Sequence, residues 1–487
     1  MNDEEFEKMM EEEDDALIGD DEDNEAYPRV VQEWIESAGE VSTKNEVPCA
    51  MAFMCLLGTI CSDMVAVKFK RNVEDCRIHF CWIQTTGSGK STLFNFLGPV
   101  VKDVYKRINA LESMVDKYDV VDVKDFTTPA LIGSVKEMGK NEEGEMEYED
   151  NPGLLLGSGL VAFDEFENVG VFKAHTHKEG LVGHLNTMMN TLWGQNYVIN
   201  KKLTNGPMIY CDARRSVYAT TYPPKNLQEV IADTGLLQRM VLFVRETDDA
   251  EKDQMMMNLI DAIGVDDNID QPIEKFSNAF FKIYTTLKER NLELIQDNPN
   301  MSERDIALSM VDFEPQVRDV MKYEYYNMVD YLRGVRPEVK ETTEKFTARL
   351  FVNLTKMSVL MSISEAPSIT DKSKRYVVSR RNVRQASKLI RQCYKALVSW
   401  LDIALRERRQ SIVETAGINH WKNAFEESKK DNEGFVHKTE LIIKFMSLTS
   451  SSRPTAFRKF KKISALFDEK KIQKSPYVKW KVSDNEV

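Results

Sequence analysis

The chain has 487 residues, of which 42% are hydrophobic and 29% charged, and its formal net charge is −13. This size and composition are typical of a globular protein with two or three domains. No run of 18 apolar residues occurs and the N-terminus is acidic, so we expect neither a membrane span nor a signal peptide, and a cytoplasmic location. The seven cysteines form no Cys-x-x-Cys pair, which predicts buried thiols in a reducing compartment.

Residues 1–26 hold fourteen Asp or Glu and one Lys, so this segment alone accounts for the net charge of the chain. A block of like charges repels itself and predicts a disordered acidic tail. The tail could keep the protein soluble. Alternatively, it could mimic nucleic acid and guard a basic channel or recruit a basic partner.

Residues 27–77 predict a small helical N-terminal collar. Apolar side chains recur at helical spacing there, and residues 50–61 are almost continuously apolar. Pro48 and Gly58 are expected to punctuate the helical region.

A strand over residues 64–70 and a turn over residues 71–75 are predicted to lead into the strongest chemical signal. This signal is an apolar strand followed by a glycine-containing loop and a helix start. The loop and the helix start contain Gln84, Thr85, Thr86, Gly87, Ser88, Gly89, Lys90, Ser91 and Thr92.

A helix N-terminus offers unpaired backbone N–H groups and a positive dipole end, and glycine lets the backbone approach a phosphate closely. We therefore predict that residues 85–92 bind ATP, that Lys90 reaches the β- and γ-phosphates and that Ser91 ligates Mg²⁺. Gln84 stands where such loops usually open with glycine. The alternative is an ordinary turn with a similar sequence.

Residues 118–126 predict a second strand, and the acidic residues 140–150 predict an exposed loop or hairpin. Residues 159–163 then form an apolar strand that ends in Asp164 and Glu165. Carboxylates at this position can hold the water shell of Mg²⁺ and polarise an attacking water, respectively. The alternative is a strand that simply ends in surface charges.

Residues 216–221 predict another strand, which ends in Thr220 and Thr221. Their hydroxyls could hold the attacking water or contact the γ-phosphate, or they could merely cap the strand. Arg239 precedes a further apolar strand and is the candidate for stabilising negative charge during catalysis.

These residues resemble a family of P-loop helicases of phages, plasmids and other mobile elements, often fused to primase modules. The resemblance covers about residues 28–400. It lies in Gly87-Ser88-Gly89-Lys90-Ser91, Asp125 to Leu131, Phe163-Asp164-Glu165, Leu185 to Gly194, Ala219 to Pro224 and Gly235 to Arg239.

Asp164-Glu165-Phe166-Glu167 and Leu236-Leu237-Gln238-Arg239-Met240 are also similar to motifs of the MCM-type replicative helicases of the AAA+ superfamily. Glu167, Gln238 and Met240 depart from those motifs. The resemblance implies an α/β fold with a P-loop NTPase (AAA+-like) core, ATP and Mg²⁺ as cofactors, and a homo-hexamer. In such a ring Arg239 would act on the ATP of a neighbouring subunit.

The implied function is that of an ATP-dependent, ring-forming replicative DNA helicase of a mobile genetic element. It would translocate on single-stranded DNA in the host cytosol, with a primase or polymerase as partner. The alternative is a DNA-binding initiator, helicase loader or packaging motor that uses ATP without processive unwinding.

Two regions, a hairpin and the C-terminal domain, are candidates for contact with nucleic acid. Residues 197–206 read as a hairpin that carries Lys201 and Lys202 and precedes the strand at residues 216–221. These lysines could bind phosphates in the pore of a ring, or the hairpin could simply be solvated.

The rest of the chain predicts an ATPase core over residues 78–250, a helical lid and support domain over 251–412 and a winged-helix DNA-binding domain over 416–487. Residues 437–481 hold twelve Lys or Arg and three Asp or Glu. The candidate DNA contacts are Arg458, Lys459, Lys461 and Lys462. A winged helix that binds protein is the alternative.

Overall fold

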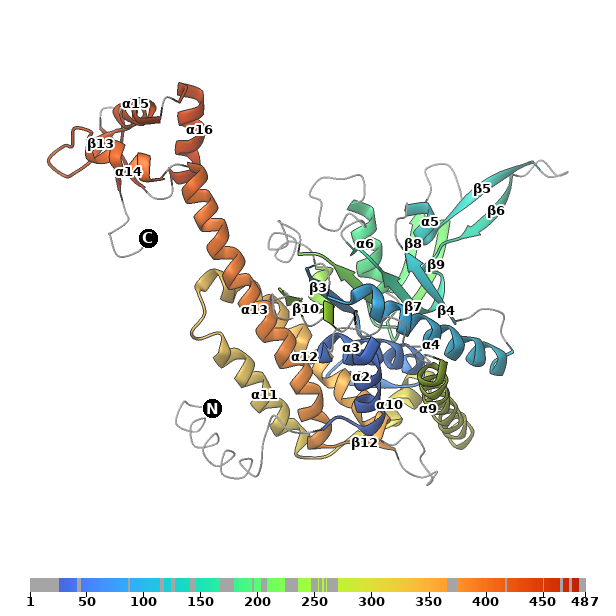
Figure 1. Cartoon of the computed structure of the whole chain (residues 1–487). Coiled ribbons are helices and arrows are strands. Elements are labelled where there is room, and N and C mark those ends of the chain that lie inside the picture. The colour runs from blue at the N-terminus through green and yellow to red at the C-terminus, as the bar shows by residue number, and fades with distance from the viewer. Residues whose placement is uncertain are drawn as a thin grey trace. The chain divides into compact units, whose positions relative to one another are not determined.

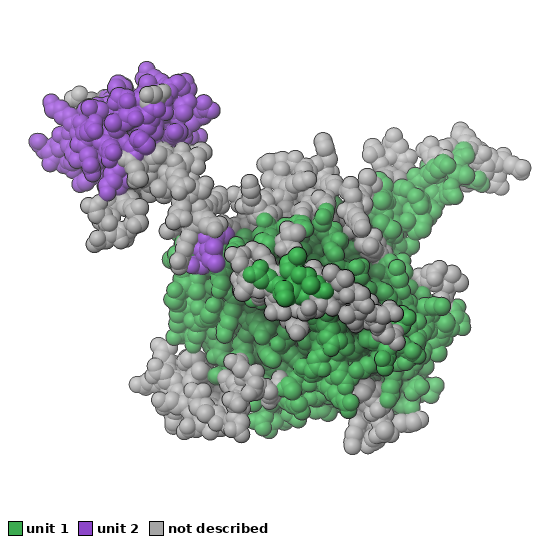
Figure 2. Space-filling view, viewed as in Figure 1, with its two compact units in different colours: residues 1–400 green, residues 401–487 purple. Residues whose placement is uncertain are grey.

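The chain forms two compact units, residues 1–400 and 401–487 (Figure 2). The computed structural model describes residues 26–41, 45–85, 88–113, 118–123, 128–140, 146–166, 179–194, 197–202, 208–223, 235–246, 253, 256, 257, 260, 270–365, 375–416, 418–449, 451–464, 467–472 and 475–480. The acidic segment 1–25 therefore lies outside the described residues. The finer domain boundaries within residues 1–400 stay a prediction.

A parallel sheet lies at the centre of the first unit (Figure 1). Across the sheet the strands are β10 (Val241–Arg245), β3 (Phe80–Gln84), β9 (Met208–Thr221), β7 (Gly157–Phe163) and β4 (Tyr118–Val123). Each neighbouring pair is parallel. Because parallel sheets are covered on both faces, their strands are continuous apolar runs, and all five residues of β3 are buried. The predicted α/β class is confirmed at this level.

β9 is longer than the predicted strand over residues 216–221, since it begins at Met208. Its first part pairs antiparallel with β8 (Val198–Lys202), with Lys201 opposite Ile209. The hairpin predicted within residues 197–206 was therefore wrong in its second arm. That arm is the beginning of β9 itself, so the hairpin and the strand that ends in Thr220 and Thr221 are one continuous element.

Helix α3 (Glu46–Cys61) is packed directly against β3, β7 and β9, and α2 (Arg29–Val41) packs against α3. Every residue of α3 from Val47 onward is buried, as expected for a helix that is apolar on all sides. Of the two residues predicted to punctuate this region, Gly58 lies inside α3 without interrupting it, so that part of the prediction was wrong, whereas Pro48 lies at the beginning of the helix. Pro48 lies in the first turn, where backbone N–H groups have no partner within the helix.

Gly58 has a packing role inside α3. A Cβ atom at this position would lie 2.4 Å from the carbonyl oxygen of Cys76, which is too close for any side chain. Glycine therefore allows the helix backbone to touch the segment that enters β3.

Two further hairpins belong to the first unit. β1 (Ala66–Phe69) pairs with β2 (Asn72–Asp75), so the turn predicted over residues 71–75 was wrong, and the bend lies at Lys70, whose φ is +53°. β5 (Gly133–Lys140) pairs with β6 (Met146–Pro152) and projects from the unit, as Figure 1 shows. The hairpin predicted around residues 140–150 is thus present and begins earlier.

The other described elements of the first unit are mainly helical. They are α4 (Lys90–Leu111), α5 (Thr128–Ile132), α6 (Glu179–Met188), the 3₁₀ turn η3 (Leu237–Arg239), α9 (Asp270–Asp297), α10 (Glu303–Ser309), β11 (Val311–Phe313), α11 (Val317–Tyr331), α12 (Pro337–Glu365), β12 (Tyr376–Val378) and α13 (Arg380–Ala416). The long helices α9, α11, α12 and α13 agree with the helical character predicted for residues 251–412. Within the described part of the chain, no helix combines the length and the apolar character needed to cross a membrane.

The second unit contains the last part of α13, then α14 (Ile418–Glu426), α15 (Lys438–Thr449) and α16 (Arg453–Ile463). β13 (Val436–His437), β14 (Phe467–Ile472) and β15 (Ser475–Trp480) form a small antiparallel sheet in the order β13-β15-β14. Its core is aromatic, and the rings of Trp421 and Phe445 stack with centroids 3.7 Å apart.

Candidate functional site

The carboxyl edge of the parallel sheet gathers most of the predicted catalytic residues. After β3 the chain crosses to β4 on one side, and it later adds β10 on the other side of β3. In open parallel sheets, ligands bind outside the carboxyl ends of the strands at such a switch in direction. The ends of β3, β9 and β7 meet at this point, because these three strands are neighbours.

The turn between β3 and α4 supplies the first part of the site. Gly89 has φ +75°, in the left-handed region that glycine tolerates, and α4 begins at Lys90. The Lys90 ammonium is buried and donates to the carbonyl oxygens of Gln84 and Thr85, the latter at 3.2 Å. It also lies 4.4 Å from the ring centroid of Tyr222, a residue that was not predicted.

The remaining residues of the predicted loop have different environments. Ser88 is buried, whereas Ser91 and Thr92 are exposed in the first turn of α4. Thr86 and Gly87 lie outside the described residues.

Gln84, which departs from the usual loop glycine, is the last residue of β3. Its buried side-chain oxygen accepts hydrogen bonds from Trp82 Nε1 at 2.7 Å and from Asn45 Nδ2 at 3.2 Å. Its side chain therefore links β3 to the start of α3, so the loop proper begins after it.

The ends of β7 and β9 supply the second part of the site. Thr220 is fully buried, and its Oγ1 donates to Asp164 Oδ1 at 3.0 Å. Glu165 is exposed and has φ +59°, a conformation that is uncommon for residues other than glycine. Thr221 donates its hydroxyl to the carbonyl of Tyr222 at 3.3 Å. The structure thus brings Asp164 and Thr220 into contact at the edge where Lys90 begins α4.

Arg239 is not brought to this edge. It lies in η3, directly before β10, at the amino edge of the same sheet. The five residues of β10 separate the two edges by roughly 16 Å. Arg239 Nη1 donates to the carbonyl of Gly235 at 2.8 Å and to Asn186 Oδ1 at 3.2 Å. Burial, and to a smaller extent the charge of Arg349, lower the pKa of Arg239.

The donor set at the carboxyl edge fits Mg²⁺. Ser91 offers a hydroxyl and Asp164 a carboxylate, and Mg²⁺ bound together with a nucleotide needs few protein oxygens. Among the described residues, no group of three or more His, Cys, Asp or Glu could hold a metal ion. All seven cysteines are free and buried, as predicted.

The predicted nucleic-acid contacts lie on two elements. On β8, Lys201 is partly exposed, and Lys202 pairs with Met208 in the strand register. On α16, Arg458 and Lys461 are exposed, but the Nζ of Lys459 lies 5.8 Å from the ring centroid of Phe445. Lys459 therefore packs toward the core. The side chains of Lys202 and Lys462 lie outside the described residues.

Sequence reasoning missed a buried arginine at the amino edge. Arg77 forms an ion pair with Asp75 at 3.0 Å and donates to the carbonyls of Met188 and Arg215, both at 3.1 Å. It thereby ties the start of β3 to β9 and to the end of α6. The available signal was an arginine placed directly before a buried strand, where a charge needs partners.

No protein-family model matches this chain, and no curated protein matches it. The functional inference therefore depends on its own residues and their geometry.

Proposed function

We propose that this chain is a P-loop ATPase of the AAA+ type, and that it is a ring-forming replicative DNA helicase of a mobile genetic element. The observation that carries the proposal is the contact of Thr220 with Asp164 at 3.0 Å, at the edge where Lys90 begins α4. A basic group, a carboxylate and a hydroxyl at the carboxyl ends of three adjacent parallel strands are suited to bind a nucleotide triphosphate with Mg²⁺.

Each residue has a role in this proposal. Lys90 and Ser91 bind the phosphates and Mg²⁺, which neutralises charge on the phosphates when bound. Asp164 would help to hold the hydrated ion, and Thr220 keeps that carboxylate in place. Glu165 polarises the attacking water as a general base. Its backbone conformation turns the chain sharply after β7, and such outliers cluster at functional sites.

The position of Arg239 favours an assembly of several copies. At the amino edge it is too far from Lys90 to touch a nucleotide bound by its own chain. An arginine that stabilises negative charge during phosphoryl transfer would therefore come from a neighbouring copy. A closed ring, the proposed homo-hexamer, supplies such a neighbour to every site.

DNA is the proposed polymer substrate. The second unit combines α14, α15 and α16 with a small antiparallel sheet, which supports the interpretation as a winged helix. Arg458 and Lys461 are exposed on α16 and suited to contact phosphates. Lys201 on the β8–β9 hairpin is the proposed contact of the first unit. In this proposal residues 27–77 serve as a collar and residues 251–412 as a lid and support.

The proposal is tested by ATP turnover and strand separation on a forked duplex. We expect turnover that single-stranded DNA stimulates, and unwinding that needs a free tail. Glu165→Gln should lower turnover by at least about 100-fold, because general-base catalysis contributes 10²- to 10⁴-fold. Lys90→Ala should lower it by a similar factor, because it removes a cation that stabilises charge on the phosphates. Glu147→Gln, an exposed glutamate of β6, is the matched control.

Two results would change the interpretation. ATP turnover that survives both Lys90→Ala and Glu165→Gln would overturn the ATPase proposal. Turnover that DNA stimulates without any strand separation would instead assign the chain to the initiators, loaders or packaging motors.

A further inference from the structure

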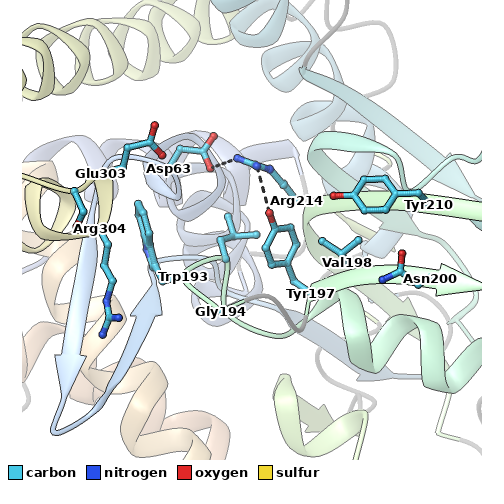
Figure 3. A pocket seen from close by; sticks show the side chains of 12 residues that line it. Asp63, Trp193, Gly194, Tyr197, Val198, Asn200, Tyr210, Arg214, Glu303 and Arg304 are labelled. Atoms are coloured by element: carbon cyan, nitrogen blue, oxygen red, sulfur yellow. Dashed lines mark hydrogen bonds and ion pairs between the residues drawn. The ribbon is translucent and has the colours of Figure 1, made fainter.

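A pocket with a volume of about 710 Å³ lies at the amino edge of the sheet, on the outward face of the β8–β9 hairpin (Figure 3). This volume is within the usual range for small-molecule sites. The pocket is lined by Asp63, Leu192, Trp193, Gly194, Tyr197, Val198, Asn200, Tyr210, Arg214, Ser302, Glu303 and Arg304.

The pocket is separate from the proposed nucleotide site. Arg214 lies six residues before Thr220 on β9, which corresponds to roughly 20 Å along an extended strand. One polypeptide can therefore bind one ligand at the carboxyl edge and another at this pocket.

Three aromatic side chains border the pocket. Figure 3 shows Tyr210 and Asn200 on the side of the hairpin and Trp193 on the opposite side. Tyr210 is 63% exposed although it is a large aromatic residue in a strand, and it pairs with Asn200 across the hairpin. An exposed ring beside an amide offers a stacking surface together with a hydrogen-bond donor and acceptor.

Arg214 holds Tyr197, the aromatic residue that lies between these two sides of the pocket. Its guanidinium donates to Tyr197 Oη at 3.3 Å and lies 5.7 Å from the centroid of that ring. It also forms ion pairs with Asp63 at 3.4 Å and with Asp212 at 3.1 Å. These contacts fix the aromatic wall before any ligand binds, which lowers the entropy lost on binding.

The charges of the lining balance. Asp63 and Glu303 oppose Arg214 and Arg304, so the pocket presents no excess of either sign. Charged side chains of opposite sign favour the binding of a phosphate or of a cation, and the balanced lining favours neither. An uncharged, planar ligand with hydrogen-bonding edges fits aromatic rings and an amide better than either ion.

We propose that this pocket binds a nucleobase, which stacks on Tyr210 and forms hydrogen bonds with Asn200. The base belongs either to a free nucleoside or to a single-stranded nucleic acid. The inference does not depend on the proposed nucleotide site, because it uses residues of the opposite edge. Its nucleic-acid alternative extends the DNA contact proposed for Lys201 on the same hairpin.

The first experiment titrates the full-length protein with cytidine, thymidine or adenosine in the presence of one equivalent of Mg·ADP. Saturation-transfer NMR reports which nucleoside protons contact the protein. Tyr210→Ala should weaken binding roughly 5- to 100-fold, as expected for the loss of one base–aromatic stack. Asn200→Ala should also weaken it, and Tyr210→Phe should retain it because the ring remains.

Tyr148→Ala is the matched control, since Tyr148 is 39% exposed on β6 and does not line the pocket. Equal melting temperatures of the Tyr210 variants and the wild type would exclude unfolding as the cause of lost binding.

The second experiment distinguishes the source of the base. A single-stranded oligonucleotide is compared with an abasic strand of the same length. If the base comes from a strand, Tyr210→Ala weakens binding of the normal oligonucleotide and leaves the abasic strand unaffected. If Tyr210→Ala weakens only the binding of free nucleosides, a nucleoside is the ligand. If Tyr210→Ala and Asn200→Ala change neither the binding of nucleosides nor that of the oligonucleotide, the pocket does not bind a base and the inference is overturned.

Discussion

Thr220 is a buried residue at the end of β9, and its hydroxyl forms a hydrogen bond with a residue that directly follows β7. It donates to Asp164 at 3.0 Å, so it fixes the orientation of a carboxylate that is only partly buried. A group that orients a metal-associated carboxylate acts on activity through that carboxylate. Thr220 is therefore a positioning residue in the proposed ATPase.

Replacing Thr220 with valine preserves the shape of the side chain and removes the hydroxyl. We expect ATP turnover to fall about 10- to 100-fold and the Mg²⁺ concentration for half-maximal activity to rise, as is typical when an outer-shell partner is lost. Steady-state turnover across a Mg²⁺ series measures both effects. Thr355→Val is the control, because Thr355 donates within its own helix, α12, to Phe351. Equal turnover and Mg²⁺ dependence in Thr220→Val and wild type would contradict the assigned role.

Because of the buried His79, we expect the stability of the folded protein to depend on pH. Burial, followed by the charges of Arg77 and Lys356, lowers its pKa well below the usual value. Its Nδ1 accepts the backbone N–H of Val217 at 3.2 Å, which requires a neutral ring protonated at Nε2.

A histidine in the unfolded chain titrates near pH 6.5, so below this pH the unfolded state gains a proton that the folded state does not bind. The free energy of unfolding should therefore fall as the pH drops from 7 to 5, with a contribution of up to about 1.4 kcal/mol per pH unit from His79. Urea unfolding at several pH values measures this effect. The free energy of unfolding should fall less steeply with decreasing pH in His79→Gln than in His420→Gln, whose side chain is exposed. Identical slopes would exclude this role for His79.

At the scale of elements, α3 is stabilised by its surroundings. It is buried along almost its whole length, against the sheet on one side and other helices around it. Such a helix tolerates little change in volume, because protein interiors are close-packed. At Gly58 the carbonyl oxygen of Cys76 leaves no room for a Cβ atom.

Two glycine-to-alanine variants separate packing from helix propensity. Gly58→Ala places a Cβ 2.4 Å from the Cys76 carbonyl oxygen and should destabilise the protein by about 1–3 kcal/mol through overpacking. Gly98→Ala in α4 meets no atom within 4 Å and should be neutral or stabilising by up to about 1 kcal/mol. Thermal unfolding of both variants measures the difference. If Gly98→Ala were the more destabilising change, the packing argument would fail.

At the scale of the whole molecule, the parallel sheet separates two predicted catalytic groups. Lys90 begins at the carboxyl edge and Arg239 lies at the amino edge. If both serve one ATP, they belong to different copies of the chain.

Mixing two inactive variants tests this arrangement. Lys90→Ala and Arg239→Ala should each be nearly inactive alone. In mixed rings, an intact phosphate loop from the Arg239→Ala chain meets an intact arginine from the Lys90→Ala chain, so ATP turnover should reappear. Asn186→Ala removes a hydrogen-bond partner of Arg239 and controls for a purely structural role. No recovery, with subunit exchange shown independently by fluorescence, would remove Arg239 from the proposed role.

The second unit makes a prediction about DNA affinity in the full-length chain. Each phosphate contact contributes about 0.9 to the slope of log affinity against log salt concentration. The double variant Arg458→Ser/Lys461→Ser should therefore weaken DNA binding and reduce that slope by about two. Lys459→Ser is the matched control, because Lys459 packs over Phe445. An unchanged slope in the double variant would show that α16 does not contact DNA.

The sequence by itself determined the local elements of this protein. Apolar runs bounded by glycine and charged residues predicted β3, β7 and β10, and a helical region was predicted where α9, α11, α12 and most of α13 lie. The strand–turn–helix around Lys90 could also be predicted. These features depend on residues close together in the chain, where periodicity and backbone preference act.

Only the tertiary structure decided which of these elements are neighbours. The order of the strands places Thr220 against Asp164, moves Arg239 to the opposite edge and extends β9 into the hairpin that carries Tyr210. It also explains Gln84, whose side chain accepts a hydrogen bond from the distant Asn45. The physical reason is that strand pairing and side-chain contacts join segments far apart in sequence. Their energies depend on the partner surface, which no local pattern records.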